Sequence, residues 1–312
     1  MKKLLDEKSI EMNDEGALPL VSVITPTYKR SNMLSRAIDS VLNQTYENIQ
    51  IVIVDDNDPY TDWRKKTQEL MLTYEENPKI KYIRHDKNKN GAVARNTGIY
   101  HADGDIVCFL DDDDWFLPDK VEKQVKYLLQ NTENRAVYCG WDRDGIVIPK
   151  KHGNMSFELL SGTNLIYTNV IMMWRHDAIE CGGWDENLKR HQEAGFLLRY
   201  FKNGGKIGVI SECLVKFDTS DRSNAASNGN INEEHMKQYL DSYKDMIEAC
   251  EAEQRGAKKN IYSYRYRGVL LEYLKFHDIK GAFRLYCKIV KQMPVKFNMD
   301  LIRYFFDYLV NN

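Results

Sequence analysis

Short apolar runs alternate with helically spaced apolar residues along the first two-thirds of the chain. The runs consist mainly of apolar side chains, as expected for strands buried on both faces of a parallel sheet, and they cover residues 21–25, 49–54, 80–83 and 105–110. Between the first two, apolar residues recur every three or four positions from Met33 to Leu42, which indicates a helix. We expect the first strand to stop at Pro26 and Ser31 to cap that helix. The alternation predicts an α/β fold with a mostly parallel central sheet and flanking helices.

The pattern changes in the second half of the chain. A helix is expected over 121–129, short strands and loops over 136–175, a helix over 191–201, and strands at 206–210 and 213–217. Residues 218–230 are rich in Ser, Asn, Asp and Gly, which is typical of a loop or linker. From residue 231 onward the spacing is helical. We therefore predict a polar leader at 1–19, an α/β catalytic domain at 20–225 and a helical C-terminal region at 231–312.

Composition and charge narrow the class of protein. Apolar residues make up 43% and charged residues 29% of the 312-residue chain, as in folded globular proteins. The net charge is −2, but the segment from Arg255 to the end holds 12 Lys and Arg against 4 Asp and Glu. The rest of the chain is therefore acidic, and the basic end favours an anionic partner. Nothing in the pattern indicates nucleic-acid binding.

Cysteine usage and hydropathy bear on the compartment. The six cysteines are scattered, with no CxxC pair and no cysteine–histidine cluster. This spacing argues against a disulfide framework or zinc site and fits a reducing compartment. Neither an apolar signal-peptide core nor a run of about 18 apolar residues is present. We expect a cytoplasmic protein, with peripheral contact to the inner face of the cell membrane left open.

The most informative chemistry follows the strand at 105–110, where four carboxylates come in succession, Asp111 to Asp114. Acids at the carboxyl end of a parallel strand lie where open α/β sheets bind their ligands. On an extended backbone Asp111 and Asp113 would share one side, and Asp112 and Asp114 the other. Paired carboxylates repel unless a cation lies between them, and oxygen ligands suit Mg²⁺ or Mn²⁺. The alternative is a turn followed by a helix that opens at Pro118.

An ordered set of motifs resembles the family 2 glycosyltransferases. The segments that carry the resemblance are Val21–Arg30 (VSVITPTYKR), Ser40–Tyr46 (SVLNQTY), Ile53–Asp56 (IVDD), Asn90–Ile99 (NGAVARNTGI) and Phe109–Asp114 (FLDDDD). The resemblance covers about residues 20–220. It implies a GT-A fold, a nucleotide-sugar donor, a divalent metal and transfer with inversion at the anomeric carbon. The DxD motif of the family matches Asp111 and Asp113.

The resemblance also implies roles for residues around the donor. Asp113, with Asp111, matches the acids that bind Mn²⁺ or Mg²⁺, and Asp112 matches the acid near the ribose. Arg95 matches the basic residue beside the donor. The same resemblance implies that the donor is a UDP-sugar. Further matches are Thr25, Pro26 and Tyr28 around the base and ribose, Asp56 at the uracil edge, and Arg222 on a loop that reaches the diphosphate.

A general base is needed to take the proton of the attacking hydroxyl. The family carries this base after a Gly-Gly-aromatic-Asp stretch, which Gly182–Asp185 matches, and alignment on Arg199 places Glu193 at the base position. The family usually has Glu-Asp there, whereas this chain has Gln192-Glu193. The alternative for Glu193 is a first-turn acid that interacts favourably with the helix dipole.

The C-terminal region contains two dense aromatic and aliphatic segments, around 262–276 and 295–310, with lysines and arginines interspersed. One interpretation is a basic interfacial helix on an anionic membrane. The other is packing against the catalytic domain or a second copy of the chain. The sequence leaves both open.

Together these features predict an inverting, metal-dependent hexosyl- or N-acetylhexosaminyltransferase that modifies a bacterial surface glycan or lipid-linked acceptor. A phosphotransferase with an aspartate nucleophile expects Thr or Val after the acid pair, but Asp114 and Trp115 follow here. A sugar-nucleotide pyrophosphorylase expects a glycine-rich loop after the first strand, which Thr25–Tyr28 is not. A degenerate transferase that serves as a glycan-binding or scaffolding subunit is the remaining alternative, although the candidate acids are all present.

Overall fold

The computed structural model describes residues 18–220 and 228–311, and its core is a mixed nine-stranded sheet in the order β3-β2-β1-β4-β8-β6-β9-β5, with β7 paired to β6. One half is parallel, as predicted, because its strands are apolar on both faces. That half contains β1 (Val21–Thr27), β2 (Ile49–Asp55), β3 (Ile80–Arg84) and β4 (Ile106–Phe109).

The other half of the sheet is mostly antiparallel, although β6 and β9 run parallel to each other. Its strands are β5 (Trp115–Phe116), β6 (Ala136–Asp142), β7 (Ile146–Val147), β8 (Met172–Trp174) and β9 (Ile207–Lys216). The strand β9 replaces the two strands expected over 206–217. Its pairing with β6 shifts register between Cys139 and Trp141. The strand therefore contains an irregularity of the β-bulge type but stays paired to β6 on both sides of it.

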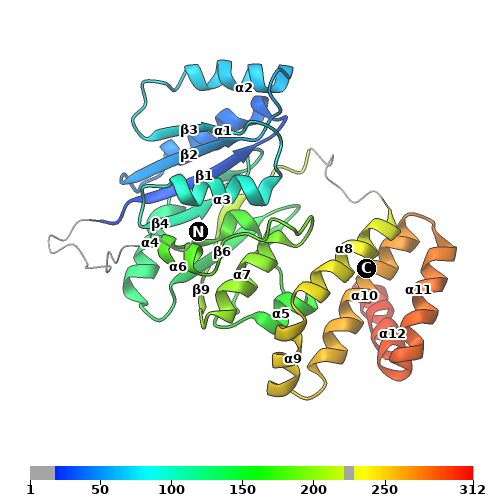
Figure 1. Ribbon diagram of the computed structural model, residues 1–312. Coiled ribbons are helices and arrows are strands. Elements are labelled where there is room, and N and C mark those ends of the chain that lie inside the picture. The colour runs from blue at the N-terminus through cyan, green and yellow to red at the C-terminus, as the bar shows by residue number, and fades with distance from the viewer. Residues whose placement is uncertain (1–17, 221–227, 312) are drawn as a thin grey trace, which may run out of the picture.

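Helices cover the sheet and join its strands (Figure 1). The longer ones have apolar faces toward the sheet, as α1 shows by burying Leu34, Ala37, Ile38 and Val41. The helices of this domain are α1 (Ser31–Leu42), α2 (Asp62–Leu72), α3 (Gly91–His101), α4 (Lys120–Gln130), α5 (Ser156–Ser161), η1 (Thr168–Val170), α6 (Arg175–Glu180) and α7 (Gln192–Lys202).

Three local expectations from the sequence are wrong. The strand β1 continues through Pro26, because β4 pairs with β1 only as far as Ile24 and leaves that edge of the strand without a partner beyond it. Ser31 is the first residue of α1 rather than its cap. Pro118 precedes α4 and accepts a hydrogen bond from the Thr45 amide through its carbonyl (2.9 Å), so it lies in the connecting turn.

The C-terminal region is helical, as predicted, and forms a bundle beside the sheet domain (Figure 1). Its helices are α8 (Gly229–Ser242), α9 (Lys244–Glu253), α10 (Ala257–Lys275), α11 (Ile279–Gln292) and α12 (Pro294–Asn311). The bundle is joined to α5 by polar contacts. Tyr239 donates to the carbonyl of Leu159 (3.1 Å), and Arg265 donates to the carbonyls of Leu159 and Leu160. The bundle therefore belongs to the same packed body as the sheet.

All six cysteines are free thiols. Across the described residues, the helices are too short or too polar to cross a bilayer.

Candidate active site

The four acids form a tight turn, which we call the acid turn (Asp111–Asp114), directly beyond β4. The Asp114 amide donates to the carbonyl of Asp111 (3.2 Å), so the backbone is not extended here. The prediction that the acids alternate between two sides of an extended backbone is therefore only partly correct. Asp111 and Asp113 line one cleft, as predicted, but Asp114 lines it too, whereas Asp112 does not.

Asp112 anchors the acid turn to the end of β1. Its carboxylate accepts hydrogen bonds from the Thr27 hydroxyl (2.8 Å) and the Tyr28 amide (3.2 Å), and its side chain is buried. Desolvation, followed by repulsion from Asp113, raises the pKa of Asp112 to about 7. The residue thus connects the first motif of the chain to the acid turn.

Asp114 anchors the acid turn on its other side. Its carboxylate accepts from the Asp218 amide (2.7 Å) at the end of β9, and from the amide nitrogen of Asn169. Asn169 also accepts from the Asp111 amide (2.9 Å). For Asp112 and Asp114, whose carboxylates anchor the turn, the turn interpretation is therefore the better one. Asp111 and Asp113 remain as the candidate metal ligands among the acids that line the cleft.

Asp111 and Asp113 each meet an arginine. Arg95 lies 2.6 Å from Asp111, and Arg30 lies 2.7 Å from Asp113. Burial, together with repulsion from Asp111, raises the pKa of Asp113 to about 6. The two carboxylates are thus crowded enough that a cation between them would relieve the repulsion.

The donor set fits Mg²⁺ or Mn²⁺. In the described chain no group of three His, Cys, Asp or Glu side chains is arranged for a metal. If such an ion binds here, the carboxylates of Asp111 and Asp113 would hold it and the other positions would be left to a ligand and water. These ions are often bound in this way, by one or two carboxylates plus substrate phosphates.

Arg95 joins three motifs that are far apart in the sequence. It extends from α3 to Asp111, donates to the Gln192 side chain at the start of α7 (3.3 Å), and lies 4.8 Å from the ring of Trp184. Trp184 is almost fully buried and stacks on Phe196 with ring centroids 4.6 Å apart. The tryptophan is therefore part of the core, and its ring packs against the guanidinium group of Arg95.

The backbone conformation before Trp184 explains why two glycines stand there. Gly182 and Gly183 have positive φ angles of 83° and 64°, and a Cβ on Gly183 would lie 2.5 Å from the side chain of Asn96. Asn96 accepts from the Trp184 amide (2.8 Å) and donates to its carbonyl (3.0 Å). This contact fixes the Gly-Gly-Trp stretch against α3 and so determines where α7 begins.

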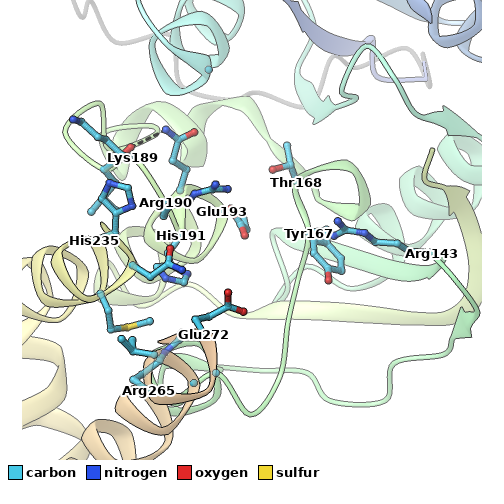
Figure 2. A pocket seen from close by; sticks show the side chains of 18 of the residues that line it. Arg143, Tyr167, Thr168, Lys189, Arg190, His191, Glu193, His235, Arg265 and Glu272 are labelled. Carbon is cyan, nitrogen blue, oxygen red and sulfur yellow. Dashed lines mark hydrogen bonds between the residues drawn. The ribbon is translucent and has the colours of Figure 1, made fainter. Parts of the chain in front are cut away.

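Glu193 lies in the first turn of α7 and lines the same cleft as Asp111 and Asp113 (Figure 2). Burial raises its pKa, and the charges of Arg95 and Asp111 act on it in opposite directions. A carboxyl group whose pKa is raised toward neutrality is suited to accept a proton.

The cleft is large, about 1220 Å³, and lies between the sheet domain and the C-terminal helices. Side chains from the acid turn and α7 line one part of it. The opposite part includes residues from α8, α10 and α12, among them His235, Arg265 and Tyr304. Figure 2 shows His235, Arg265 and Glu272 facing this space from the bundle. No local pattern in the sequence indicates that the C-terminal helices border the cleft.

The residues matched to the nucleotide lie outside this lining. Thr25 is buried within β1, Pro26 is half-buried beside it, and Tyr28 is exposed (38%) at the end of that strand. They border the acid turn through the bond from the Tyr28 amide to Asp112. Arg222 lies outside the described residues.

Asp56 is buried at the carboxyl end of β2 and holds the segment 85–90 in place. Its carboxylate accepts from the amides of Lys89 (2.8 Å) and Asn90 (3.0 Å), and it lies 2.7 Å from His85 Nδ1. Burial raises its pKa. In this structure its oxygens are thus occupied by the protein, and its role at the uracil edge stays a prediction.

Sequence reasoning missed several residues of this site. Arg30 closes the first motif, and its proximity to Asp113 could have been suspected from the charge alone. Asn169 is an uncharged polar residue without a motif, and Gln192, which stands beside Glu193 in the base motif, had no predicted role of its own. Their role depends on tertiary contacts with Asp111 and Arg95, which no local pattern signals.

Comparison with known proteins identifies the family of the chain. The family model described as "Glycosyl transferase family 2" matches residues 22–183. An uncharacterized glycosyltransferase of Methanocaldococcus jannaschii is 29% identical over 219 residues, covering 67% of this chain and 74% of that protein. The amylovoran biosynthesis glycosyltransferase AmsB of Erwinia amylovora is 28% identical over 266 residues, covering 81% of this chain and 84% of AmsB.

Solved structures share the fold. The crystal structure of S. aureus TarS 1–349 in complex with UDP-GlcNAc has a TM-score of 0.57 at 15% identity, and the match covers 88% of this chain and 92% of that one. The complex of the same fragment with UDP has a TM-score of 0.54. The predicted GT-A fold is thereby confirmed. With its matching motifs, its matching fold and a family model that spans more than half its length, the chain belongs to glycosyl transferase family 2.

Proposed function

We propose that the protein transfers a sugar from a UDP-sugar to a hydroxyl of a bacterial surface glycan or lipid-linked acceptor, with metal dependence and inversion. The observation that carries this proposal is that Asp111, Asp113 and Glu193 line one cleft at the carboxyl end of the parallel strands. The complex of TarS with UDP-GlcNAc and the role of AmsB in amylovoran biosynthesis support the donor and acceptor classes.

The donor would bind on the acidic side of the cleft. Asp111 and Asp113 would hold Mn²⁺ or Mg²⁺, which stabilises the charge that develops on a departing diphosphate. Arg95 is buried against Trp184 and bonded to Gln192, so its guanidinium is held in place next to Asp111. Such a fixed cation needs no rearrangement as charge develops on the leaving group.

The acceptor hydroxyl would transfer its proton to Glu193. The carboxylate lies at the N-terminus of α7, and its raised pKa makes it a stronger base than an exposed glutamate. A single displacement by the hydroxyl, with the base and leaving group on opposite faces of the sugar ring, inverts the anomeric carbon.

The nucleotide would lie beside the end of β1. Tyr28 presents an exposed ring there, and Thr25 and Pro26 shape the backbone beneath it. Asp56 would act at the uracil edge, through its carboxylate or through the segment 85–90 that it orders. Arg222 is proposed to approach the diphosphate.

The C-terminal bundle would also contact an anionic membrane surface. Its outer face exposes large apolar side chains of α12, with Val295, Met299, Ile302 and Phe306 between 63% and 70% exposed. The neighbouring helix α11 also carries exposed basic residues, among them Lys291. A basic face with exposed aromatic and aliphatic side chains is typical of interfacial helices.

The proposed activity is tested by a screen of nucleotide sugars with Mn²⁺ that measures release of the free nucleotide diphosphate. The proposal expects UDP release from a UDP-sugar by the wild type and loss of release in excess EDTA. Unchanged release in EDTA would remove the metal from the proposal. Absence of any turnover or nucleotide binding would instead favour a non-catalytic glycan-binding or scaffolding subunit.

A further inference from the structure

The lining of the cleft contains two groups of opposite charge. The acidic side contains the acid turn, Glu193 and Asp218. Five basic residues also line the cleft, and we call this group the basic wall: Arg143, Lys189, Arg190, Arg265 and Arg267. One carboxylate, Glu272, lies among them in the described lining (Figure 2). This division needs a chemical reason, because like charges gathered on one surface destabilise a protein unless a ligand uses them.

The arginines of the two sides have different partners. On the acidic side Arg30 and Arg95 pair with carboxylates at 2.7 and 2.6 Å. On the basic wall, Arg143 lies 5.1 Å from the ring centroid of Tyr167, and Arg267 lies over the rings of Tyr264 and Tyr304 at 5.3 and 5.0 Å. Across the parts of the chain that the structure describes, neither of these two guanidinium groups forms an ion pair with Asp or Glu. Their charges are therefore available to a ligand.

Arg265 adds positive charge whose hydrogen bonds go to backbone carbonyls rather than to a carboxylate. It is buried, and it donates to the carbonyls of Leu159 and Leu160 at the end of α5. Burial, followed by the charges of Arg265 and Arg190, lowers the pKa of His191 to about 3. His191 is therefore neutral at physiological pH, and the positive field at this wall comes from the arginines and Lys189.

The combination of arginines with aromatic rings indicates the kind of ligand. A guanidinium group matches phosphate and carboxylate oxygens with two parallel hydrogen bonds. Tyrosine rings such as those of Tyr167, Tyr264 and Tyr304 offer apolar faces and hydroxyl groups, which suit sugar rings. Because these rings already support the guanidinium groups of Arg143 and Arg267, one ligand can use both.

We infer that the basic wall is the acceptor subsite and that the acceptor is an anionic glycan, which carries phosphate or carboxylate groups near the sugar that is modified. This inference rests on the proposed function, since it assigns the second half of the same cleft. Glu193 lies next to His191, at the junction of the two sides, where a hydroxyl of such an acceptor would meet the base.

Binding of labelled oligosaccharides tests the inference. The probes are fluorescein-labelled hexamers of galacturonic acid, of glycerol phosphate and of α-1,4-linked glucose, which is neutral. The full chain, with Mn²⁺ and UDP present, is titrated into each probe, and binding is measured as a rise in fluorescence anisotropy. We expect at least one anionic hexamer to bind about tenfold or more tighter than the neutral one, with affinity that falls as salt rises. The comparison of the two anionic probes distinguishes carboxylate from phosphate recognition.

Substitutions locate the binding on the basic wall. Arg143→Gln and Arg267→Gln should each weaken binding of the anionic hexamer by about tenfold, the usual consequence of losing a charged hydrogen bond. Arg267→Lys should recover part of the loss, because the charge remains. Arg255→Gln is the matched control, since Arg255 is exposed and lies outside the cleft lining, and it should bind like the wild type. Arg143 is exposed on a turn, so its variant tests the inference without risk to folding.

Two results would overturn the inference. One is equal binding of neutral and anionic hexamers, or no binding of either anionic hexamer. The other is a loss of Mn²⁺–UDP affinity in Arg143→Gln and Arg267→Gln, which would assign the wall to the donor. UDP release from a UDP-sugar, measured on the same preparations, separates these results from a failure of the proposed function, because that release requires no acceptor glycan.

Discussion

The two sides of the cleft differ in how they are built as well as in their charge. The acidic side is assembled by residues of the sheet domain, where Arg95 and Asn169 connect the acid turn to α7 and η1. The basic wall comes from loops and from the C-terminal helices, and Arg265 fixes α10 against α5. The acidic side thus draws mainly on residues of the motifs, whereas the positions of Arg265 and Arg267 in the basic wall depend on how the bundle docks. On the proposed assignment of donor and acceptor, catalytic chemistry and acceptor choice could vary independently.

The largest effect is expected from Asp113→Asn, which removes a proposed metal ligand from the acidic side. Transfer should fall by at least about 10³-fold, because stabilisation of the leaving group depends on the bound cation. The fold should persist, since the substitution relieves repulsion with Asp111. Turnover in Mn²⁺ and circular dichroism measure the two effects. Asp86→Asn, at an exposed acid that pairs with Lys89, is the control and should keep full activity. Full turnover by Asp113→Asn would refute the metal assignment.

The next largest effect is expected from Glu193→Gln. The variant should bind UDP with wild-type affinity by calorimetry but lose roughly 10²–10⁴-fold in kcat, which is typical for loss of a positioned base. Glu186→Gln is a matched control, because Glu186 bonds to Asn96 and lies outside the cleft lining. A loss confined to KM would move the role of base to another residue, with Asp185 the next candidate.

The pH dependence follows from the same residue. Burial raises the pKa of Glu193, and the base must be ionised to accept a proton. The wild-type kcat should therefore fall as pH decreases through this raised value, which lies above that of an exposed glutamate. In Glu193→Gln the residual rate should lose this acidic limb. An acidic limb that is unchanged in the variant would show that a different group titrates.

The smallest effect on turnover is expected at the outer face of α12, which belongs to neither side of the cleft. The double variant Ile302→Ser, Phe306→Ser should release UDP from the UDP-sugar at the wild-type rate. It should no longer co-sediment with anionic vesicles at low salt. Ile146→Ser, at an equally exposed isoleucine on β7, should co-sediment like the wild type. If the wild type fails to bind vesicles and the double variant has a lower mass by light scattering, the face joins copies of the chain instead.

The comparison also explains what the sequence could predict. The parallel strands, the helical C-terminal region and the pairing of Asp111 with Asp113 toward one cleft follow from local patterns. The turn conformation of the four acids does not, because its anchors, Thr27 and Asn169, act through tertiary contacts. The single strand β9 was predicted as two, because the polar pair Ser211-Glu212 interrupts its apolar pattern where the register shifts opposite Gly140.

The basic wall was the least predictable part of the site. The excess of Lys and Arg after residue 255 indicated an anionic partner, but it gave no sign that Arg265 and Arg267 face the same space as Glu193. That arrangement depends on the docking of α10 against α5, which is decided by a few side-chain contacts to backbone carbonyls. Charge composition therefore indicated an anionic partner, which stays a prediction, but it did not indicate where such a partner would bind.

Calorimetric titration of UDP in the presence of Mn²⁺ tests the division of the cleft most directly. The account predicts that Asp113→Asn loses the Mn²⁺-dependent part of UDP affinity, while Arg267→Gln and Glu193→Gln bind UDP like the wild type. The opposite pattern, in which Asp113→Asn binds normally and Arg267→Gln does not, would contradict the account, because the donor would then occupy the basic wall.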